Sequence, residues 1–392
     1  MKKIDISQDA TKLLDTDFVG LHSGGGRSSI KGGQNAADAA LNNLDISGYA
    51  KNRSQVLPYQ DRGASKLSPY IRHNLLGLKR VWDHVARAPF ADREKFQDEL
   101  LWQEYARHLY ARIGKRLFSN LRFEQIWDKP GNGWPQGMAC VDFAVDELHT
   151  DGWLVNQSRM WLASHWTVRN GFGWLNGQEE MYRHLIDGSR AANLLGWQWT
   201  VGAGTGKAYG FARWQVQKRA PSLCSGCALN KNCPIEDFPA EVALDNTAFE
   251  SIIKADPNID ATTGPLSVQS NEAPQYVLLT VDSLGDEDPA MAANPDLPVV
   301  FVFNVEALKK LQLSAKRIYF YLETLQDLAL RRDLTVLMGS PYEFARENPV
   351  AVTYAPVPSF AKFEKVAQLH PYPWLRTPHA KSIGSFTAWR GK

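Results

Sequence analysis

The stretch that decides the fold is Leu185-Ile-Asp-Gly-Ser-Arg-Ala-Ala-Asn-Leu-Leu-Gly-Trp-Gln-Trp199. It lies in a region, about Asp61–Trp214, where apolar residues recur at spacings of three and four, which is typical of amphipathic helices. A helical asparagine is more often a cap or a surface residue. Asn193, however, stands four residues before Trp197 on the same predicted helix face. This spacing indicates an amide that points inward with the tryptophan.

Outside this stretch, the chain divides into regions that differ in their patterns of apolar and polar residues. Helical periodicity covers Arg93–Leu117 and Cys140–Thr167, and a polar, acidic segment at 236–274 reads as a linker. Beyond it, β-rich runs alternate with helical stretches such as Ser314–Arg331, which predicts a small parallel sheet. We therefore expect a multidomain α and α/β protein, with an all-α domain at 1–235 and a Rossmann-like α/β domain at 275–392. The predicted strands are Tyr276–Val281, Val299–Phe303, Thr335–Met338 and Val350–Tyr354.

The bulk composition is that of an ordinary globular chain. Of 392 residues, 44% are hydrophobic and 22% charged, and a formal net charge of +2 excludes nucleic-acid binding by general electrostatics. The longest apolar run, Leu297–Phe303, is too short for a membrane span, and the first residues lack a secretion signal. We expect a cytoplasmic protein with no membrane partner, and the sequence indicates no oligomeric state. Eleven of the 13 tryptophans precede residue 236, which concentrates stacking surfaces in one half.

Three of the four cysteines form one short run, Cys224-Ser-Gly-Cys227-Ala-Leu-Asn-Lys-Asn-Cys233-Pro234, and Cys140 stands alone upstream. This ligand count suits a cubane iron–sulfur cluster, and a structural zinc site accepts the same thiolates. Spacing alone divides the two about evenly. Disulfides are the weaker third choice, because nothing predicts secretion.

Five ordered motifs in the helical half resemble the FAD-binding domain of the photolyase/cryptochrome family. The resemblance runs from about Tyr49 to Arg213, and the tail from Tyr276 to Lys392 looks like that family's antenna domain. The antenna domain comes first in the family and last here, which implies a circular permutation. The motifs are Tyr49-Ala-Lys-Asn-Arg53, Gly63-Ala-Ser-Lys-Leu-Ser-Pro-Tyr70, Glu99-Leu-Leu-Trp-Gln-Glu-Tyr-Ala-Arg-His108, Gly152-Trp-Leu-Val-Asn-Gln-Ser-Arg-Met160 and Leu185–Trp199.

The resemblance implies two cofactors. One branch of the family carries a [4Fe–4S] cluster with a ligand at the place of Cys140 and three more after the Trp-Gln-Trp motif, which favours iron–sulfur over zinc. The phosphates of FAD are expected at residues 65–68, the Arg159–Asp187 pair beside the isoalloxazine, and Asn193 near flavin N5. No residue identifies an antenna chromophore, whether deazaflavin, folate, lumazine or none. The expected FAD-binding residues are Tyr49, Ser65, Lys66, Leu67, Ser68, Asn156, Arg159, Asp187, Ser189 and Asn193, and the expected cluster ligands are Cys140, Cys224, Cys227 and Cys233.

Helical spacing also places Glu99, Trp102 and Gln103 on one face, as it does Asn156, Arg159 and Met160. By resemblance, Trp102 and Trp199 stack on a flipped pyrimidine dimer, and Glu99, with a proton retained by burial, contacts it. Trp197 and Trp174 match the inner members of an electron-transfer chain. Its outermost member is left open among Trp127, Trp134, Trp161 and Trp166. The expected catalytic residues are Glu99, Asn193, Trp197 and Trp174, and the expected substrate-binding residues are Glu99, Trp102, Gln103, Met160, Trp199, Arg53 and Arg213.

The sequence departs from the family pattern at three places. Gln103 and Gln157 stand where dimer photolyases of this type often have phosphate-binding arginines, and Ser189 replaces an aspartate. Fewer phosphate contacts predict weaker duplex binding with a flatter salt dependence. The basic candidates that remain for the DNA-facing rim are Arg53, Lys207, Arg213, Lys218 and Arg219.

The resemblance implies light-driven repair of cyclobutane pyrimidine dimers in DNA, a carbon–carbon lyase reaction driven by photoexcited reduced FAD. The alternatives are a cryptochrome-type blue-light photoreceptor, a (6-4) photoproduct photolyase, and an iron–sulfur nucleic-acid-binding protein without photochemistry. Met160 in place of a histidine favours the cyclobutane dimer. Preference for single- or double-stranded DNA is not indicated.

Overall fold

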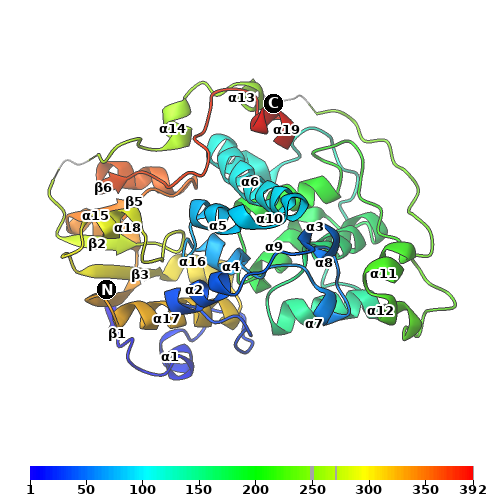
Figure 1. The fold of residues 1–392 in the computed structure, drawn as a ribbon, viewed down its shortest axis with the longest axis horizontal. Coiled ribbons are helices and arrows are strands. Elements are labelled where there is room, and N and C mark those ends of the chain that lie inside the picture. The colour runs from blue at the N-terminus through cyan, green and yellow to red at the C-terminus, as the bar shows by residue number, and fades with distance from the viewer. Residues whose placement is uncertain (248–250, 270–271, 392) are drawn as a thin grey trace.

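The computed structural model describes residues 1–247, 251–269 and 272–391. A six-stranded sheet with its helices forms one side of the molecule in Figure 1, and a helical assembly around α6 (Phe90–Ile113) forms the other. The predicted class, helical plus α/β, is confirmed. Within the described residues, no helix combines the length and the apolar character that crossing a bilayer requires.

The sheet has the order β1-β4-β3-β2-β5-β6. Strands β2 to β6 run parallel, whereas β1 pairs antiparallel with β4, so the sheet is mixed where we predicted a parallel one. The four predicted strands are present, and β1 and β6 are additions at the two edges. The strands are β1 (Lys2–Ile4), β2 (Tyr276–Leu279), β3 (Val299–Asn304), β4 (Leu334–Gly339), β5 (Val350–Thr353) and β6 (Gln368–His370).

Both faces of the sheet are covered, because side chains along a strand alternate between them. Val299, Phe301 and Phe303 enter one core with α17 (Ala315–Ala329), α1 (Ala10–Asp17) and α2 (Gln34–Asn42). Val300 and Val302 enter a second core with Phe344 of α18 (Pro341–Glu347). Burial on both faces explains the continuous apolar run of β3. Two further helices of this half are α15 (Pro289–Ala293) and α16 (Val305–Leu311).

The N-terminal segment packs on the α/β half. Ile4 of β1, Leu13 of α1 and Leu41 of α2 belong to the same core as β3 and α17. The prediction that the chain from residue 1 belongs to the helical domain is therefore wrong for this segment. Strand β1 could not be predicted from the sequence, because a three-residue edge strand has too few positions to show a period of two.

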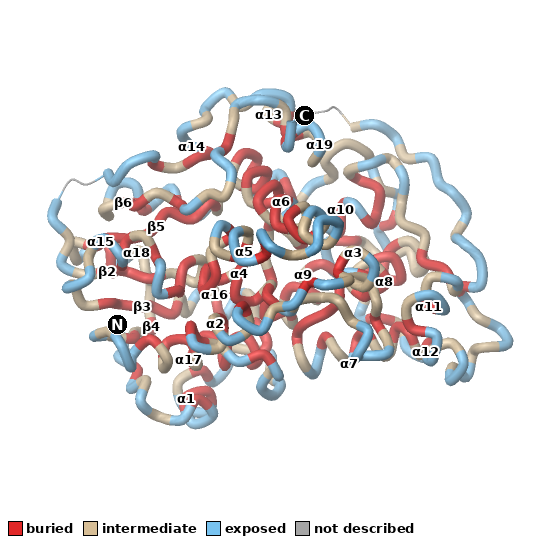
Figure 2. The backbone as a smooth tube through the Cα atoms, viewed as in Figure 1, coloured by how far each residue is buried: buried red, intermediate tan, exposed pale blue. Residues whose placement is uncertain are grey.

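The helical half is built around α6, whose buried residues recur along its length (Figure 2). The predicted helix at Cys140–Thr167 is two helices and a π-helical turn at His165–Arg169, because the chain turns at Gly152 with φ +70°. The helices of this half are α3 (Tyr49–Asn52), α4 (Ser68–Arg72), α5 (Leu78–His84), α7 (Ala139–Thr150), α8 (Asn156–Ser164), α9 (Trp174–His184), α10 (Arg190–Thr200), α11 (Arg213–Arg219) and α12 (Pro221–Ser225).

Two helices of the predicted linker and the last helix of the chain lie along α6 (Figure 1). The linker carries α13 (Ser251–Lys254) and α14 (Ile259–Thr263), and Ile253 is buried in the helical core. The chain ends in α19 (Phe386–Arg390), whose Trp389 is buried in the same core. The C-terminal segment that we assigned to the α/β domain thus returns to the helical half.

Candidate functional site

Three polar residues of the helical half come from elements that pack together, and we call Arg159, Asp187 and Asn193 the cradle. Arg159 of α8 donates from Nη2 to Asp187 Oδ2 at 2.7 Å, in the loop between α9 and α10. Asn193 lies on α10 and, like Asp187, is buried. Asp187 Oδ1 and Asn193 Nδ2 are buried without a hydrogen-bond partner. Because an unmet buried polar atom costs about 1–3 kcal/mol, these two atoms fit a ligand that presents a donor and an acceptor.

The loop predicted to hold the FAD phosphates adopts an unusual backbone. Lys66 has φ +56°, a left-handed conformation that is uncommon outside glycine and clusters at ligand sites. Its ammonium lies 5.3 Å from the centroid of the Trp153 ring. Ser68 Oγ accepts from Trp153 Nε1 at 3.0 Å, which ties this loop to the residue that precedes α8 by three positions.

The predicted FAD residues differ in exposure. Ser65 lines a polar hollow of about 770 Å³, part of it open to solvent, together with Asn52 and Arg62. Leu67 is fully buried in the core, so a ligand could meet only its backbone. Lys66 is exposed. The loop therefore offers charge and backbone groups at its surface and anchors itself through Leu67.

Three other predicted FAD residues have visible structural roles. Tyr49 is buried against Phe96, with ring centroids 4.9 Å apart. Ser189 is the N-cap of α10, its Oγ accepting from Ala192 N at 3.4 Å, which accounts for a serine at this position. Asn156 is exposed in the first turn of α8.

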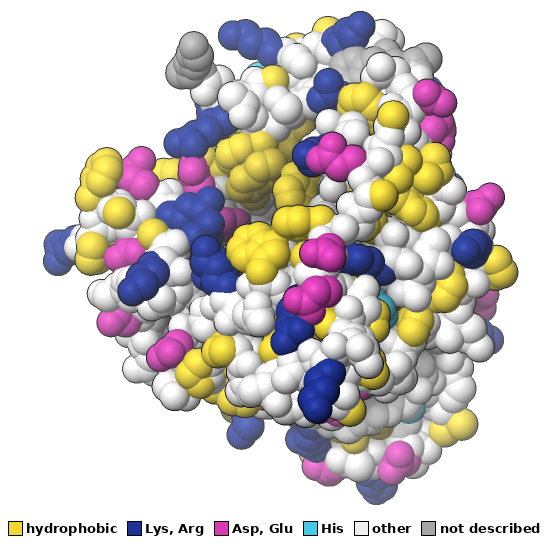
Figure 3. All heavy atoms as spheres, turned by 90° about the vertical axis from the view of Figure 1, so that its right-hand side faces the viewer, with side chains coloured by type: hydrophobic (Ala, Val, Ile, Leu, Met, Phe, Trp, Pro, Cys, Tyr) yellow, Lys and Arg dark blue, Asp and Glu magenta, His cyan; other side chains and the backbone are white. Residues whose placement is uncertain are grey.

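The predicted dimer walls lie on helices that pack together, α6 and α10. Trp102 and Trp199 are 38% and 43% exposed, so part of each indole ring reaches the surface. Trp102 stacks on Phe386 of α19 with centroids 4.0 Å apart and planes 12° apart, a partner that the sequence did not indicate. Trp199 lies 5.6 Å from the Tyr209 ring. In Figure 3 hydrophobic side chains gather in a hollow of the molecule, with Lys and Arg side chains beside it.

Glu99 differs from its prediction. Its side chain is 40% exposed and lies 3.4 Å from Arg53 Nε and 3.2 Å from Lys95 Nζ. We had expected a buried Glu99, whereas its carboxylate is reached by solvent and by two cations. Gln103 and Met160 are both half-buried, on α6 and α8.

Buried tryptophans connect the cradle region to the rest of the helical core. A Cβ on Gly177 would lie 2.4 Å from the Trp197 ring and 2.8 Å from the Trp166 ring, so both indoles touch α9 at this glycine. Trp166 in turn lies 5.1 Å from Trp134, centroid to centroid. Trp174, also buried, begins α9 one turn earlier and donates to Asn120 Oδ1 at 3.2 Å. These contacts link Trp166 and Trp134, two of the four tryptophans that the sequence left open, to Trp197.

The four cysteines line one hollow of about 340 Å³ at the far end of the helical half, with Met138 and Ile235. All four are free thiols, and burial, together with Cys224, raises the pKa of Cys140 to about 12. Thiolates around one zinc ion lie about 3.8 Å apart, given Zn–S bonds of about 2.3 Å. Among the described residues, no three of the four cysteines bring their sulfurs within 4.8 Å of one another. Four thiolates that line one hollow are a donor set that both an iron–sulfur cluster and a zinc ion accept.

Two basic residues that we predicted to contact DNA form ion pairs with acidic side chains of the chain itself. Arg213 lines the cysteine hollow and pairs with Glu236 at 2.6 Å. Lys207 pairs with Glu241 at 2.5 Å on the surface. Gln157 is buried and donates to the Tyr209 hydroxyl at 2.8 Å, which places it behind the rim rather than on it.

Comparisons with known proteins agree with this geometry. Residues 96–220 match the family described as the FAD binding domain of DNA photolyase. The chain is 33% identical over 168 residues to the deoxyribodipyrimidine photo-lyase of Thermus thermophilus, covering 40% of this chain and 39% of that protein. It is 27% identical over 192 residues to that of Synechococcus sp., covering 45% and 40%. The chain thus matches about two fifths of the length of these relatives.

Two solved structures are also similar in part. A bacterial class III photolyase from Agrobacterium tumefaciens is 23% identical over 48% of this chain and 43% of its own, with a TM-score of 0.41. A Synechocystis cryptochrome is 24% identical over 50% and 45%, with a TM-score of 0.42.

Proposed function

We propose that this protein belongs to the photolyase/cryptochrome family and repairs cyclobutane pyrimidine dimers in DNA with light. The observation that carries the proposal is the pair of unpartnered atoms, Asp187 Oδ1 and Asn193 Nδ2, inside the region similar to photolyase FAD-binding domains. A ring imide supplies the donor that Asp187 lacks, and a ring nitrogen supplies an acceptor for Asn193. FAD presents both groups.

Bound reduced FAD would supply the photoexcited electron that splits the dimer and takes the electron back. The chain's own part is to bind and orient. Arg159 fixes Asp187 through the 2.7 Å hydrogen bond, so that the second carboxylate oxygen keeps one direction. Asn193 offers a neutral amide, which supports a reduced ring without adding charge. Lys66, with Ser65 and Ser68, would meet the phosphates.

On the substrate side, Trp102 and Trp199 offer exposed indole faces for an extruded dimer. Glu99 contacts the lesion as an acceptor oriented by Arg53, and Met160 lines the same side. Because Gln103 and Gln157 supply no positive charge, we expect a shallow salt dependence of DNA binding. Arg53 is the basic residue best placed beside this surface.

We further propose a [4Fe–4S] cluster held by Cys140, Cys224, Cys227 and Cys233. The donor set is four thiolates that line one hollow, and the positions of the cysteines relative to the motifs, which resemble the family's iron–sulfur branch, favour a cluster over zinc. Bound there, it would clamp the start of α7 to the segment after α12. The α/β half, 275–392, would be an antenna-type domain placed last by circular permutation, and its chromophore is not assigned.

One observation favours a photoreceptor as the second candidate. Phe386 covers one face of Trp102, and the Glu99 carboxylate forms ion pairs with Arg53 and Lys95. A blue-light sensor of the cryptochrome type keeps flavin and tryptophans but needs no open dimer pocket. A (6-4) photolyase is less consistent with Met160 in place of a histidine.

The test is illumination of the reduced protein with an oligonucleotide that contains one cyclobutane dimer. We expect dimer loss in light and none in darkness, and Glu99→Gln should slow splitting while leaving flavin absorbance unchanged. Unchanged dimer content with flavin present rejects repair and favours the photoreceptor. Protein that binds no flavin rejects both photochemical functions.

A further inference from the structure

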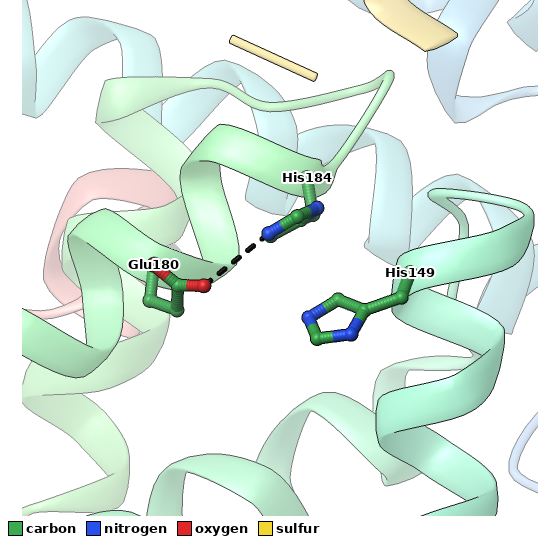
Figure 4. Close-up of side chains that lie close together, drawn as sticks. All are labelled: His149, Glu180 and His184. Carbon is green, nitrogen blue, oxygen red and sulfur yellow. Dashed lines mark hydrogen bonds and ion pairs between the residues drawn. The ribbon is translucent and has the colours of Figure 1, made fainter. Parts of the chain in front are cut away.

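Away from the cradle and the cysteines, two histidines and a glutamate converge between α7 and α9. Figure 4 shows His149 facing Glu180 and His184, which stand one turn apart on α9. One ligand atom from each of the three residues lies within 4.8 Å of the other two. The His149 and His184 ring centroids are 4.3 Å apart, and Glu180 Oε1 lies 3.2 Å from His184 Nε2. We propose that His149, Glu180 and His184 form a binding site for a divalent transition metal, with Zn²⁺ as its occupant.

The donor set supports this choice of ion. Two imidazole nitrogens and one carboxylate oxygen suit zinc, which in open sites takes three protein ligands and a water. Two ligands bonded at about 2.1 Å to one ion lie roughly 3.0–3.4 Å apart. Glu180 Oε1 and His184 Nε2 are joined by a 3.2 Å hydrogen bond, and this separation also lies within the range for two ligands of one ion. A small movement of the exposed His149 would complete the set.

The neighbouring side chains leave the three ligand atoms facing one another. Arg183 Nη1 pairs with Glu180 Oε2 at 2.8 Å, so that Oε1 is left to face the histidines. The other charges nearby are Lys316, whose Nζ donates to His149 O at 2.7 Å, and Asp146 and Asp151. Two cations and two anions surround the three ligands, so the local field does not oppose a cation.

The position gives the metal a structural consequence. Ser314 N, at the start of α17, donates to Arg183 O at 2.9 Å, and Ile186 N donates to Gly152 O at 2.9 Å. The site thus lies where α7, α9 and α17 meet, three residues before Asp187 of the cradle. Zinc at this point would fix the C-terminal ends of α7 and α9 to each other and stiffen the loop that carries Asp187.

The experiment compares the metal bound by the wild type with the metal bound by variants of the proposed ligands. Any metal that the cysteines hold is present in all of these proteins and does not contribute to the difference. The full-length wild type, His149→Ala and His184→Ala are titrated with Co²⁺, and bound metal per chain is counted after dialysis. His84→Ala, an exposed histidine on α5, is the matched control. We expect the two ligand variants to bind one Co²⁺ fewer than the wild type, with at least about a 100-fold loss of affinity, and the control to match the wild type.

Two further readouts decide the outcome. The difference spectrum should show the weak visible bands of cobalt in nitrogen and oxygen ligands, and added Zn²⁺ should displace that cobalt. Equal Co²⁺ content in wild type and His149→Ala, with unchanged circular dichroism, overturns the proposal. A difference spectrum dominated by thiolate-to-cobalt charge transfer overturns it too, because the lost ion would belong to the cysteines. None of these readouts depends on flavin or DNA.

Discussion

Two buried polar groups in the helical half look alike by composition and differ in what surrounds them. The first is the cradle of Arg159, Asp187 and Asn193. The second, which we call the tail cluster, is Glu104, His108 and Arg112, spaced four residues apart on α6. Both contain charged side chains withdrawn from water. Burial alone would rank the tail cluster as the better functional site.

Their partners reverse that ranking. The tail cluster binds the chain's own C-terminal segment: Glu104 accepts from Leu375 N at 2.7 Å, and Trp389 Nε1 donates to His108 Nδ1 at 2.6 Å. Arg112 donates to Lys381 O at 2.8 Å. Glu104 Oε2 is also buried without a hydrogen-bond partner, so an unmet atom alone does not separate the two groups. They differ in that all three tail-cluster side chains hydrogen-bond to the C-terminal segment, whereas the cradle leaves both an acceptor, Asp187 Oδ1, and a donor, Asn193 Nδ2, open to a ligand.

The largest effect should come from breaking the tail cluster at Arg112. Its side chain is fully buried and lies 3.2 Å from Asp256, which is 3% exposed. Arg112→Met leaves Asp256 buried and unpaired, which should lower the free energy of unfolding by about 3–5 kcal/mol. Urea denaturation measures this loss. Flavin content per folded chain should not change.

The double variant Arg112→Met/Asp256→Asn is the control for that interpretation. It removes both charges, and we expect it to recover part of the lost stability. A single variant that loses less than about 1 kcal/mol would show that the tail is held by other contacts.

The second effect concerns Glu104 and depends on pH. Burial raises the pKa of Glu104 from 4.5 to about 7, with one oxygen left without a partner. Between these values the folded protein holds a proton that the unfolded chain has released, so the stabilising contribution is full below pH 4.5 and lost as pH rises to 7. Glu104→Gln should therefore be more stable than wild type above pH 7, by about 3 kcal/mol, and equal to it at about pH 4.

Denaturation curves at several pH values test this, with Glu94→Gln, an exposed carboxylate on the same helix, as the control. A constant difference between wild type and Glu104→Gln at all pH values would contradict the assignment, because a proton-linked effect must change with pH.

The third effect tests the cradle. Asp187→Asn weakens the acceptor that we assign to the flavin imide, and should reduce FAD affinity about 10- to 150-fold, or about 1.5–3 kcal/mol. Ser340→Ala is the matched control in the other half of the molecule: it removes the N-cap of α18, costing about 1 kcal/mol of stability, and should leave flavin affinity unchanged. Flavin titration and urea denaturation of both variants separate binding from folding. If Asp187→Asn binds flavin as tightly as the wild type and Ser340→Ala do, the cradle is misplaced.

Much of the fold could be predicted because apolar residues recur at regular spacings along its helices and strands. The apolar run of β3 reflects burial on both faces, and the period of α6 reflects burial repeated at every turn, and both were predicted within a few residues of their observed ends. Strand β1 was missed because its three residues gain their identity only from pairing with β4. The break at Gly152 was missed because apolar spacing continued across it.

Less of the candidate site than of the fold could be predicted from the sequence. The Arg159–Asp187 pair followed from motif order, but the stacking of Phe386 on Trp102 joins α19 to α6, which are far apart in the sequence, and no local pattern predicts it. The same holds for Trp166, which reaches Trp197 only through the packing of Gly177. Glu99 was misjudged because burial cannot be read from helical spacing when the neighbouring cation, Arg53, lies on another element.

The smallest effect lies where the tail meets the predicted dimer surface. Phe386→Ala removes the ring that covers one face of Trp102, and since the stack is partly exposed we expect a loss of about 0.5–1.5 kcal/mol in stability. Collisional quenching of tryptophan fluorescence should rise as that face opens. Affinity for dimer-containing DNA should stay equal or increase, whereas Trp102→Ala should lose about 1–3 kcal/mol of it. If Phe386→Ala weakens DNA binding as much as Trp102→Ala does, then Phe386 is itself part of the DNA surface, and the tail extends the site instead of covering it.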